Sequence, residues 1–361
     1  MRNWQREKTV VFESDDWGGL ERGVPNLDTK KKLARHPEVM RLAKSNARWR
    51  HRFYTVSDTL ESVADMDVLF KLLAHYRGGD GRPAVFTPVC LQASPDYDAI
   101  RANGFTQYVD IGIDKPLPKL YQDRGDIIAK AREGIRMGVW APESHNTRMA
   151  AHIDPHKWVR FLREKKDKAL NVFFDHYMIG RQFDKFLNVG LEFDSMGLRE
   201  LKKWVATGTR YFKKAYGYAP RVAGIADARS RCKVLEEVME EIMVENGVKV
   251  ITNAVNHGMG EYNRKLGLTY THRNVCFEPL TEPADEIQNA WRKAYKEICR
   301  AWERNEPAII STHRLHYVAL NLKQKQMGLA QLERLLDTIH RKHPEAVYIA
   351  SYELEGLYKR K

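Results

Sequence analysis

Two adjacent aspartates, Asp15 and Asp16, follow an apolar run at residues 9–12 that is typical of a buried strand. In parallel α/β proteins, reactive side chains collect where strands end and the chain turns towards a helix. Neighbouring carboxylates point in different directions, so one can bind a cation while the other takes a proton. Gly18 and Gly19 allow the backbone to turn sharply after them. By itself the motif fits a solvated acidic turn as well as a functional site.

Three histidines, His145, His152 and His156, lie close together after another strand-like run. Asp154 and Pro155 are typical of a helix start, which places His145 and His152 in the preceding loop and His156 in the first turn. Imidazole nitrogens are suitable ligands for zinc and similar ions. This cluster at a strand-to-helix junction therefore favours a metal site over separate surface histidines.

His313 lies just beyond an apolar run at residues 308–311. Taken alone, it is most simply a polar strand end, although a general acid or base would be useful at this position. The three turns together carry carboxylates and imidazoles at strand ends. That combination is typical of an open catalytic site for a divalent metal.

Short apolar runs alternate with helical patterns along nearly the whole chain, which predicts a parallel sheet with crossover helices. The strand candidates are residues 9–12, 83–89, 108–113, 138–141, 170–174, 221–225, 248–252, 308–311 and 347–351. The helix candidates are residues 58–77, where Asp58 and Glu61 have the spacing of a capping box, and 197–216, 229–246, 284–304 and 328–343. About eight such units without a linker predict one α/β domain over residues 1–361, a (β/α) barrel. Residues 18–57 are expected to form an insertion near the active face.

The composition is that of a globular protein, because 43% hydrophobic residues can fill a core and 30% are charged. No stretch approaches the ~20 apolar residues of a membrane span. The first residues lack the apolar core of a signal peptide, so we expect a cytoplasmic protein. The four cysteines, Cys90, Cys232, Cys276 and Cys299, are far apart and predict neither disulfides nor a zinc knuckle.

The formal net charge of +13 comes from short basic clusters that are scattered along the chain, mostly with acidic neighbours. Solvated helix faces explain this pattern better than a nucleic-acid groove does. We therefore do not expect a nucleic-acid partner. The oligomeric state stays open.

These motifs resemble those of the polysaccharide deacetylase-like (NodB-homology) family, and most of all its uncharacterised branch. The resemblance runs through nearly the whole chain. It is carried by residues 14–18, by residues 83–87 and 93–97, by the His145 and His152 loop leading to Trp158, and by residues 311–314. It implies a glycoside hydrolase/deacetylase type of β/α barrel, often distorted and seven-stranded.

The resemblance also implies roles for individual residues. Asp15 would be the catalytic base, and His313 would protonate the leaving group. Asp16, His145 and His152 would bind a divalent metal, with zinc expected first and cobalt, manganese or nickel as alternatives. The substrate would be an N-acetylated or O-acetylated sugar or polysaccharide, from which the enzyme removes the acetyl group.

The sequence departs from the usual family motifs in two of these turns. Trp17 follows the acidic pair where the family has glycine, and His145 and His152 are seven residues apart instead of four. His152 and His156 do have the four-residue spacing. His156 or His316 is therefore an alternative for one of the assigned roles.

Two other functions stay open at this point. Related barrels hydrolyse glycosidic bonds with two carboxyl groups, and here Asp15 or Asp16 could act with Glu143 or Asp175. Alternatively, the departures from the motifs could indicate a barrel that binds a glycan or an anionic polymer without catalysis.

Three further side chains have open roles. Arg221 is a candidate for the arginine motif of the family. Trp17 and Tyr317 could stack on a sugar ring, but packing in the core or at the rim explains them at least as well.

Overall fold

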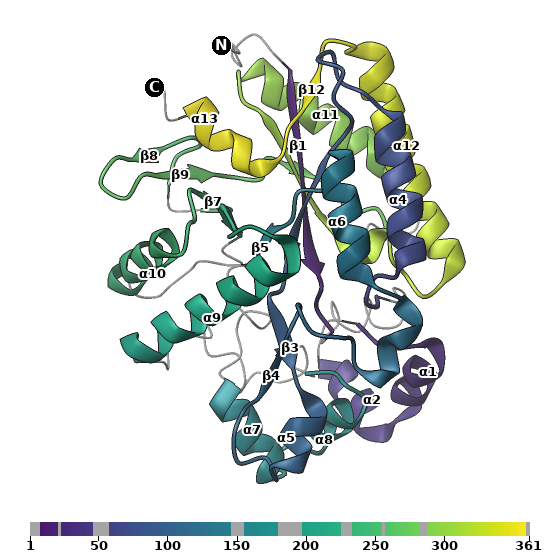
Figure 1. Cartoon of the computed structure of the whole chain (residues 1–361). Helices are drawn as coiled ribbons and strands as arrows, with labels where there is room; N and C mark the ends of the chain where they lie inside the picture. Colours follow the sequence, from purple (N-terminus) through teal and green to yellow (C-terminus); the bar gives the residue numbers. More distant parts are fainter. Residues whose placement is uncertain are drawn as a thin grey trace.

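The computed structural model describes residues 8–20, 23–45, 58–145, 155–179, 197–224, 233–254, 257–281 and 287–358. Its centre is β1 (Thr9–Trp17), in which all nine residues are buried. β1 pairs in parallel with β11 (Ala308–His313) on one side and with β2 (Phe86–Cys90) on the other. Figure 1 shows β1 running through the middle of the molecule.

The remaining strands extend this sheet in the order β10-β11-β1-β2-β5-β6-β7-β9-β8, with β12 paired to β1 beside that path. These strands are β5 (Glu143–Ser144), β6 (Val222–Gly224), β7 (Val250–Thr252), β8 (Tyr262–Asn263), β9 (Leu268–Thr271), β10 (Val275–Cys276) and β12 (Val347–Tyr348). All of these pairings are parallel except that of β8 with β9.

The chain itself brings the two ends of this sheet together. Only residues 272–274 separate β9, which pairs with β7, from β10, which pairs with β11. Seven extended segments of the described chain therefore follow one another in a circuit: β1, β2, β5, β6, β7, the β9–β10 segment and β11. The predicted distorted β/α barrel is confirmed.

Helices cover the outer face of the curled sheet. They are α4 (Val63–His75), α6 (Ile127–Met137), α9 (Leu198–Tyr216), α10 (Lys233–Glu245), α11 (Ala290–Glu303) and α12 (Leu322–Lys342). α13 (Leu354–Tyr358), near the C-terminus, packs instead in a separate cluster with Val11 of β1. Val10 and Phe12 of β1 pack outwards in the main core, with Leu69 of α4 and Leu332 of α12. Because side chains alternate along a strand, Glu13 and Asp15 point to the opposite face, inside the barrel.

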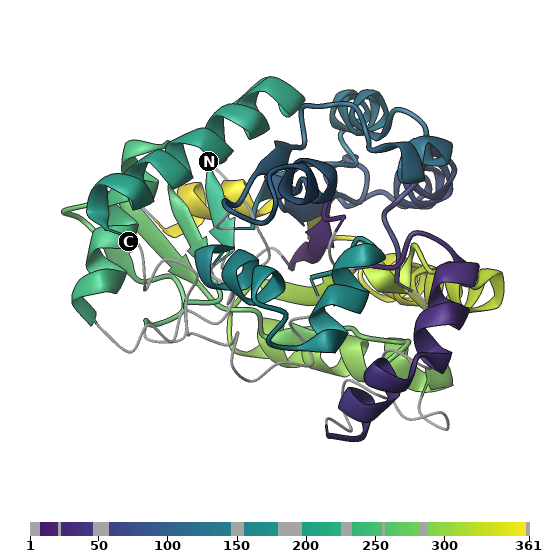
Figure 2. The ribbon, with the colours of Figure 1, turned by 90° about the horizontal axis from the view of Figure 1, so that it is seen from below.

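A second group of elements lies at the carboxyl end of β1, at the bottom of Figure 1 and nearest the viewer in Figure 2. It contains α1 (Leu27–Arg35), α2 (Pro37–Ser45), β3 (Ala93–Pro95), β4 (Asp110–Gly112), α5 (Tyr97–Ala102), α7 (Pro155–Arg163) and α8 (Lys168–Asp175). α1 and α2 occupy part of the predicted insertion. Short 3-10 helices are η1 (Lys119–Arg124), η3 (Ile287–Asn289), η4 (Arg314–His316) and η5 (Ser351–Glu353).

Two local predictions were wrong. The predicted strand at 170–174 is helix α8, because Asp167 caps its first turn and the apolar residues at 169, 170, 173 and 174 form one buried helical face. The capping box of α4 is formed by Ser62 and Asp65 instead of Asp58 and Glu61. Both of the latter side chains bind Arg314 instead.

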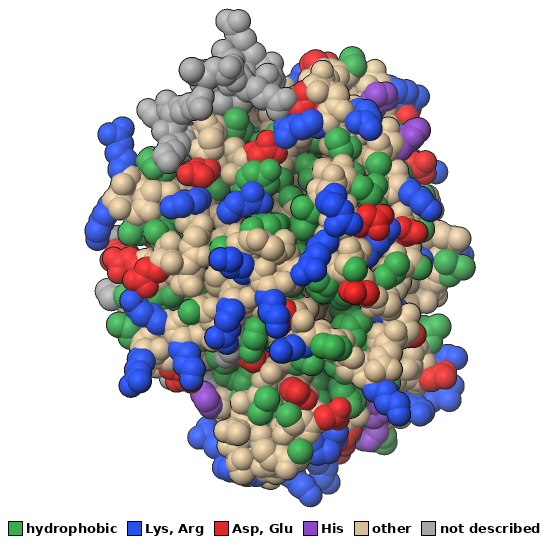
Figure 3. Space-filling model, viewed as in Figure 1, with side chains coloured by type: hydrophobic (Ala, Val, Ile, Leu, Met, Phe, Trp, Pro, Cys, Tyr) green, Lys and Arg blue, Asp and Glu red, His purple; other side chains and the backbone are tan. Residues whose placement is uncertain are grey.

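Within the described ranges, no helix is long and apolar enough to cross a membrane. Cys90, Cys276 and Cys299 are free thiols, and Cys232 lies outside the described residues. Figure 3 shows Lys and Arg side chains spread over the visible face among acidic and apolar ones, without gathering into one patch.

The contact between α12 and η4 gives a test of the packing. A Cβ atom at Gly328 would overlap the carbonyl oxygen of His316, whereas one at Gly356 of α13 would meet no atom within 4 Å. We expect Gly328→Ala to lower the free energy of unfolding by roughly 1–3 kcal/mol, because the helix must move away from η4. Gly356→Ala should leave it unchanged or raise it slightly. Urea denaturation compares the two variants, and equal stability would contradict the packing.

Candidate active site

The acidic turn at the end of β1 has an irregular backbone. Between the pairs Ser14–Pro88 and Trp17–Cys90 the register shifts, so that Asp15 and Asp16 stand opposite one residue of β2. Asp16 has a φ of +74°, in the left-handed region that a side chain rarely adopts. A bulge of this kind re-aims a side chain, so the two adjacent carboxylates need not point to opposite faces of the sheet. Both residues are buried.

Arg273, in the link between β9 and β10, binds the carboxylates inside the barrel. Its Nη1 and Nη2 donate to Asp15 Oδ2 and Oδ1 at 2.5 and 2.6 Å, and its Nε donates to Glu13 Oε2 at 2.7 Å. Burial raises the pKa of Asp15, but Arg273, together with His145 and His313, outweighs burial and lowers it below the usual range. Asp15 is therefore a carboxylate at neutral pH.

Glu278 binds two imidazoles on the other side of the site. His313 Nδ1 lies 2.6 Å from Glu278 Oε1, and His316 Nε2 lies 2.5 Å from Glu278 Oε2. The backbone N–H of Leu280 donates to His316 Nδ1, so the proton of His316 is on Nε2 and is donated to Glu278. Glu278 thus fixes the orientation of both rings.

The orientation of His313 turns its second nitrogen towards Asp15. Its Nε2 lies 3.8 Å from Asp15 Oδ2. Burial lowers the pKa of His313, but Glu278, Asp16 and Asp15 outweigh it and raise the pKa to about 9. A carboxylate with a lowered pKa therefore faces an imidazolium with a raised pKa. When the environment moves two pKa values apart in this way, the ionised carboxylate can serve as the base and the protonated imidazole as the acid.

The structure describes two of the three predicted metal ligands. Asp16 is the next-to-last residue of β1, and the buried His145 follows β5, where its backbone N–H donates to the carbonyl of Cys90 in β2. His145 is close enough to Asp15 to contribute to the lowering of its pKa. A carboxylate on β1 and an imidazole after β5, with β2 between these two strands, are ligand types that fit a zinc-type ion. His152 lies outside the described residues.

A second group within the described residues could also hold a metal ion. The ligand atoms of Glu278, His313 and His316 lie within 4.8 Å of one another. At 2.5 and 2.6 Å, however, the two imidazole–carboxylate contacts are hydrogen bonds that contain protons. An ion could enter only after both protons leave.

Several predicted side chains are engaged elsewhere. His156 is exposed on α7 and binds Glu200 at 2.7 Å. Glu143 accepts hydrogen bonds from the backbone N–H and the guanidinium of Arg221. Asp175, at the end of α8, is exposed and binds Arg101. Arg221 is thus the partner of Glu143, and each carboxyl group proposed as a glycosidase partner is bound by an arginine.

Trp17 and Tyr317 are both core residues. Trp17 is buried against Trp140, and its Nε1 donates to Ser14 Oγ. Tyr317 is buried against Phe86. Neither ring is available to stack on a sugar.

Arg273 and Glu278 were not identified from the sequence. Glu278 follows the apolar residues 275–277, so it meets the same strand-end criterion that identified His313. Arg273 is the middle one of three polar residues, 272–274, between two short strands, and only the tertiary pairing shows which carboxylates it meets.

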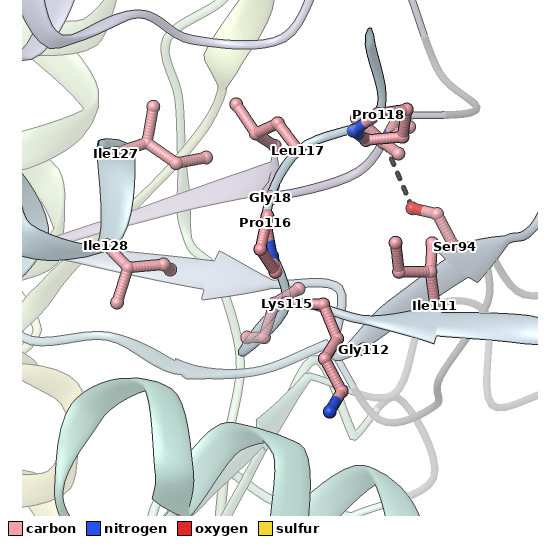
Figure 4. A pocket seen from close by; sticks show the side chains of 12 residues that line it. Gly18, Ser94, Ile111, Gly112, Lys115, Pro116, Leu117, Pro118, Ile127 and Ile128 are labelled. Carbon is pink, nitrogen blue, oxygen red and sulfur yellow. Dashed lines mark hydrogen bonds between the residues drawn. The ribbon is translucent and has the colours of Figure 1, made fainter. Parts of the chain in front are cut away.

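An apolar pocket adjoins the acidic turn at Gly18 (Figure 4). It is small, with a volume of about 20 Å³, and its walls include Ile111, Leu117, Ile127 and Ile128. The backbone N–H of Leu20 donates to Ser94 Oγ at its edge. The lining contains no carboxylate or histidine, and its one ionisable side chain is Lys115, so this pocket offers mainly apolar contact.

Comparisons with known proteins found similar folds only among solved structures, since no family model and no curated protein matches the sequence. A probable polysaccharide deacetylase from Pseudomonas aeruginosa PAO1 has 10% identity and a TM-score of 0.48, over 98% of this chain and 92% of that chain. A putative polysaccharide deacetylase from Mycobacterium smegmatis has 9% identity and a TM-score of 0.44, over 98% and 90%. Puue allantoinase has 10% identity and a TM-score of 0.46, over 98% and 91%.

The buried contact of Arg273 predicts a large effect on stability. Arg273→Met removes the buried cation that hydrogen-bonds both Glu13 and Asp15, so the free energy of unfolding should fall by about 3–5 kcal/mol. Lys202→Met, which removes an exposed ion pair with Glu245, should cost at most about 1 kcal/mol. Urea denaturation measures both, and a similar loss in the two variants would show that the Arg273 contact is not a buried ion pair.

The contact of His313 with Glu278 predicts a shifted titration. By NMR, His313 should titrate near pH 9 in the wild type, and its pKa should fall markedly in Glu278→Gln. The bond between protonated His313 and Glu278 also stabilises the fold. Because the pKa of His313 is raised in the folded state, this stabilisation is complete below the unfolded pKa of about 6.5 and is lost as pH rises towards 9. A wild-type His313 that titrates near 6.5 would contradict the assignment.

Proposed function

We propose that this chain is a metal-dependent hydrolase that removes an acetyl group from an N-acetylated or O-acetylated sugar or polysaccharide. The observation that carries this proposal is the pair formed by Asp15 and His313, with 3.8 Å between Asp15 Oδ2 and His313 Nε2. Each member has its own charged partner, and both stand at the carboxyl ends of barrel strands, where reactive groups collect.

Asp15 is suited to the role of base. Its ionised carboxylate is fixed by two hydrogen bonds from Arg273 and retains lone pairs that can accept a proton from water. A carboxylate with a low pKa is a weak base, so it needs a water molecule that is already acidified. A divalent ion bound by Asp16 and His145, with His152 as the expected third ligand, would supply that acidity by lowering the pKa of water to about 7.

His313 is suited to the role of acid. Glu278 accepts the proton on Nδ1, so the proton that His313 gives up is the one on Nε2. Water adds its oxygen to the acetyl carbon, and Asp15 takes the proton that water loses. The bond from the acetyl carbon to nitrogen or oxygen then breaks, and His313 protonates the leaving amine or alcohol, leaving acetate.

The assignment to an acetylated carbohydrate rests on the motif resemblance, and two of the structures named above agree with it in their names. The arrangement of carboxyl groups supports deacetylation over glycoside hydrolysis. That second reaction needs two carboxyl groups across the scissile bond. The group opposite Asp15 is instead an imidazole.

Release of acetate from acetylated chito-oligosaccharides and acetylated xylan tests the proposal. We expect zinc-loaded wild type to release acetate, and Asp15→Asn and His313→Gln each to lower kcat roughly 100-fold to 10,000-fold. His340→Gln, an exposed histidine of α12, serves as the matched control and should retain full activity. Glycan binding without acetate release by the zinc-loaded wild type would instead support a binding protein.

A further inference from the structure

We propose that Arg314 and Glu61 are positioning residues that hold the acidic turn, and Asp16 within it, in its strained conformation. We call this pair the buried clamp. Its effect on metal binding rests on the proposed function, whereas its effect on the backbone of the turn does not.

Arg314 begins η4 and has no exposed surface. Its Nη1 donates to the carbonyl of Gly19 at 2.9 Å and to Glu61 Oε2 at 3.2 Å. Its Nε forms a longer ion pair with Asp58 Oδ1 at 3.4 Å. One guanidinium therefore joins the end of the acidic turn to the segment that precedes α4.

Glu61 completes the clamp from the other side. Its Oε1 accepts the backbone N–H of Gly18 at 2.9 Å, while its Oε2 binds Arg314. The N–H of Gly18 and the carbonyl of Gly19 are thus both held by one ion pair. These two groups follow Asp16 by only two and three residues.

The backbone of the turn needs such support. Asp16 and Gly18 both have a φ of +74°, and for an aspartate this conformation costs about 1–2 kcal/mol. A strained residue persists only where its surroundings determine its conformation. The clamp fixes the peptide groups after Asp16 and so prevents the turn from relaxing.

A buried ion pair contributes little net stability to a fold, because the desolvation of both charges offsets much of their attraction. Apolar side chains of the same size would often be as stable or more so, because charges lose their hydration on burial. Arg314 also directly follows His313 in the chain. The clamp therefore fixes the turn that carries Asp16 relative to the turn that carries His313, which apolar packing would do with less precision.

Arg314→Lys and Glu61→Gln test the clamp. Lysine keeps the charge but cannot reach Gly19, Glu61 and Asp58 together, and glutamine has one acceptor oxygen for two donors. Lys325→Met is the matched control, because Lys325 pairs with the buried Asp65 at 2.7 Å and also joins the start of α4 to another element, α12. All variants are first checked for folding by circular dichroism and urea denaturation.

Two readouts separate the clamp from the proposed function. The first is exchange of the Gly18 amide by NMR with ¹⁵N-glycine labelling, which should become roughly tenfold faster or more in both variants. The second is a Co²⁺ titration followed by visible absorption, in which affinity should fall roughly tenfold or more. Lys325→Met should change neither readout.

The outcomes are distinguishable. If folded Arg314→Lys and Glu61→Gln keep wild-type protection at Gly18, the clamp is wrong. If protection is lost while Co²⁺ affinity is unchanged, the clamp holds the turn but does not position Asp16, and the proposal is overturned. If wild type binds no Co²⁺, the metal of the proposed function is wrong, and Gly18 exchange still decides the clamp. If Arg314→Lys does not fold, Glu61→Gln decides both readouts.

Discussion

The contact of Arg273 with Glu13 and Asp15 inside the barrel is the constraint on which the rest of the structure depends. Alternation along β1 points both carboxylates inwards, where an unpaired charge would be costly. Arg273 lies in the short link that joins β9 to β10 and thereby the two ends of the sheet. The interaction that compensates the buried charges therefore also holds the closing segment of the barrel against its central strand.

One short stretch of chain sets the state of both proposed catalytic groups. Arg273 keeps Asp15 ionised, and Glu278, only five residues later, orients His313 and keeps it protonated. The proposed base and acid come from β1 and β11, which are adjacent parallel strands that pair Asp15 with His313 directly. The register of β1 and β11 thus places Asp15 beside His313, whereas Arg273 and Glu278, which follow β9, determine the protonation state of each.

The alternation of apolar runs and helical patterns was enough to predict the α/β fold. Asp15 and His313 could be assigned to the same edge of the sheet because both follow strongly apolar runs. Such runs could not identify Arg273, since the strands on either side of it are too short to show a pattern. The run at 170–174 was misassigned because a short apolar stretch fits a strand and a buried helix equally well. Asp58 and Glu61 have capping-box spacing, but a buried cation elsewhere in the chain competes for them.

The central claim is that Asp16 and His145 bind the metal while Asp15 and His313 remain free to transfer protons. An anomalous difference map at the zinc edge, from crystals of the wild type grown with zinc, tests this most directly. The account predicts a strong peak about 2.0–2.2 Å from both the Asp16 carboxylate and a nitrogen of His145. A peak bound instead by Glu278, His313 and His316, or no peak in this region of the barrel, would contradict it.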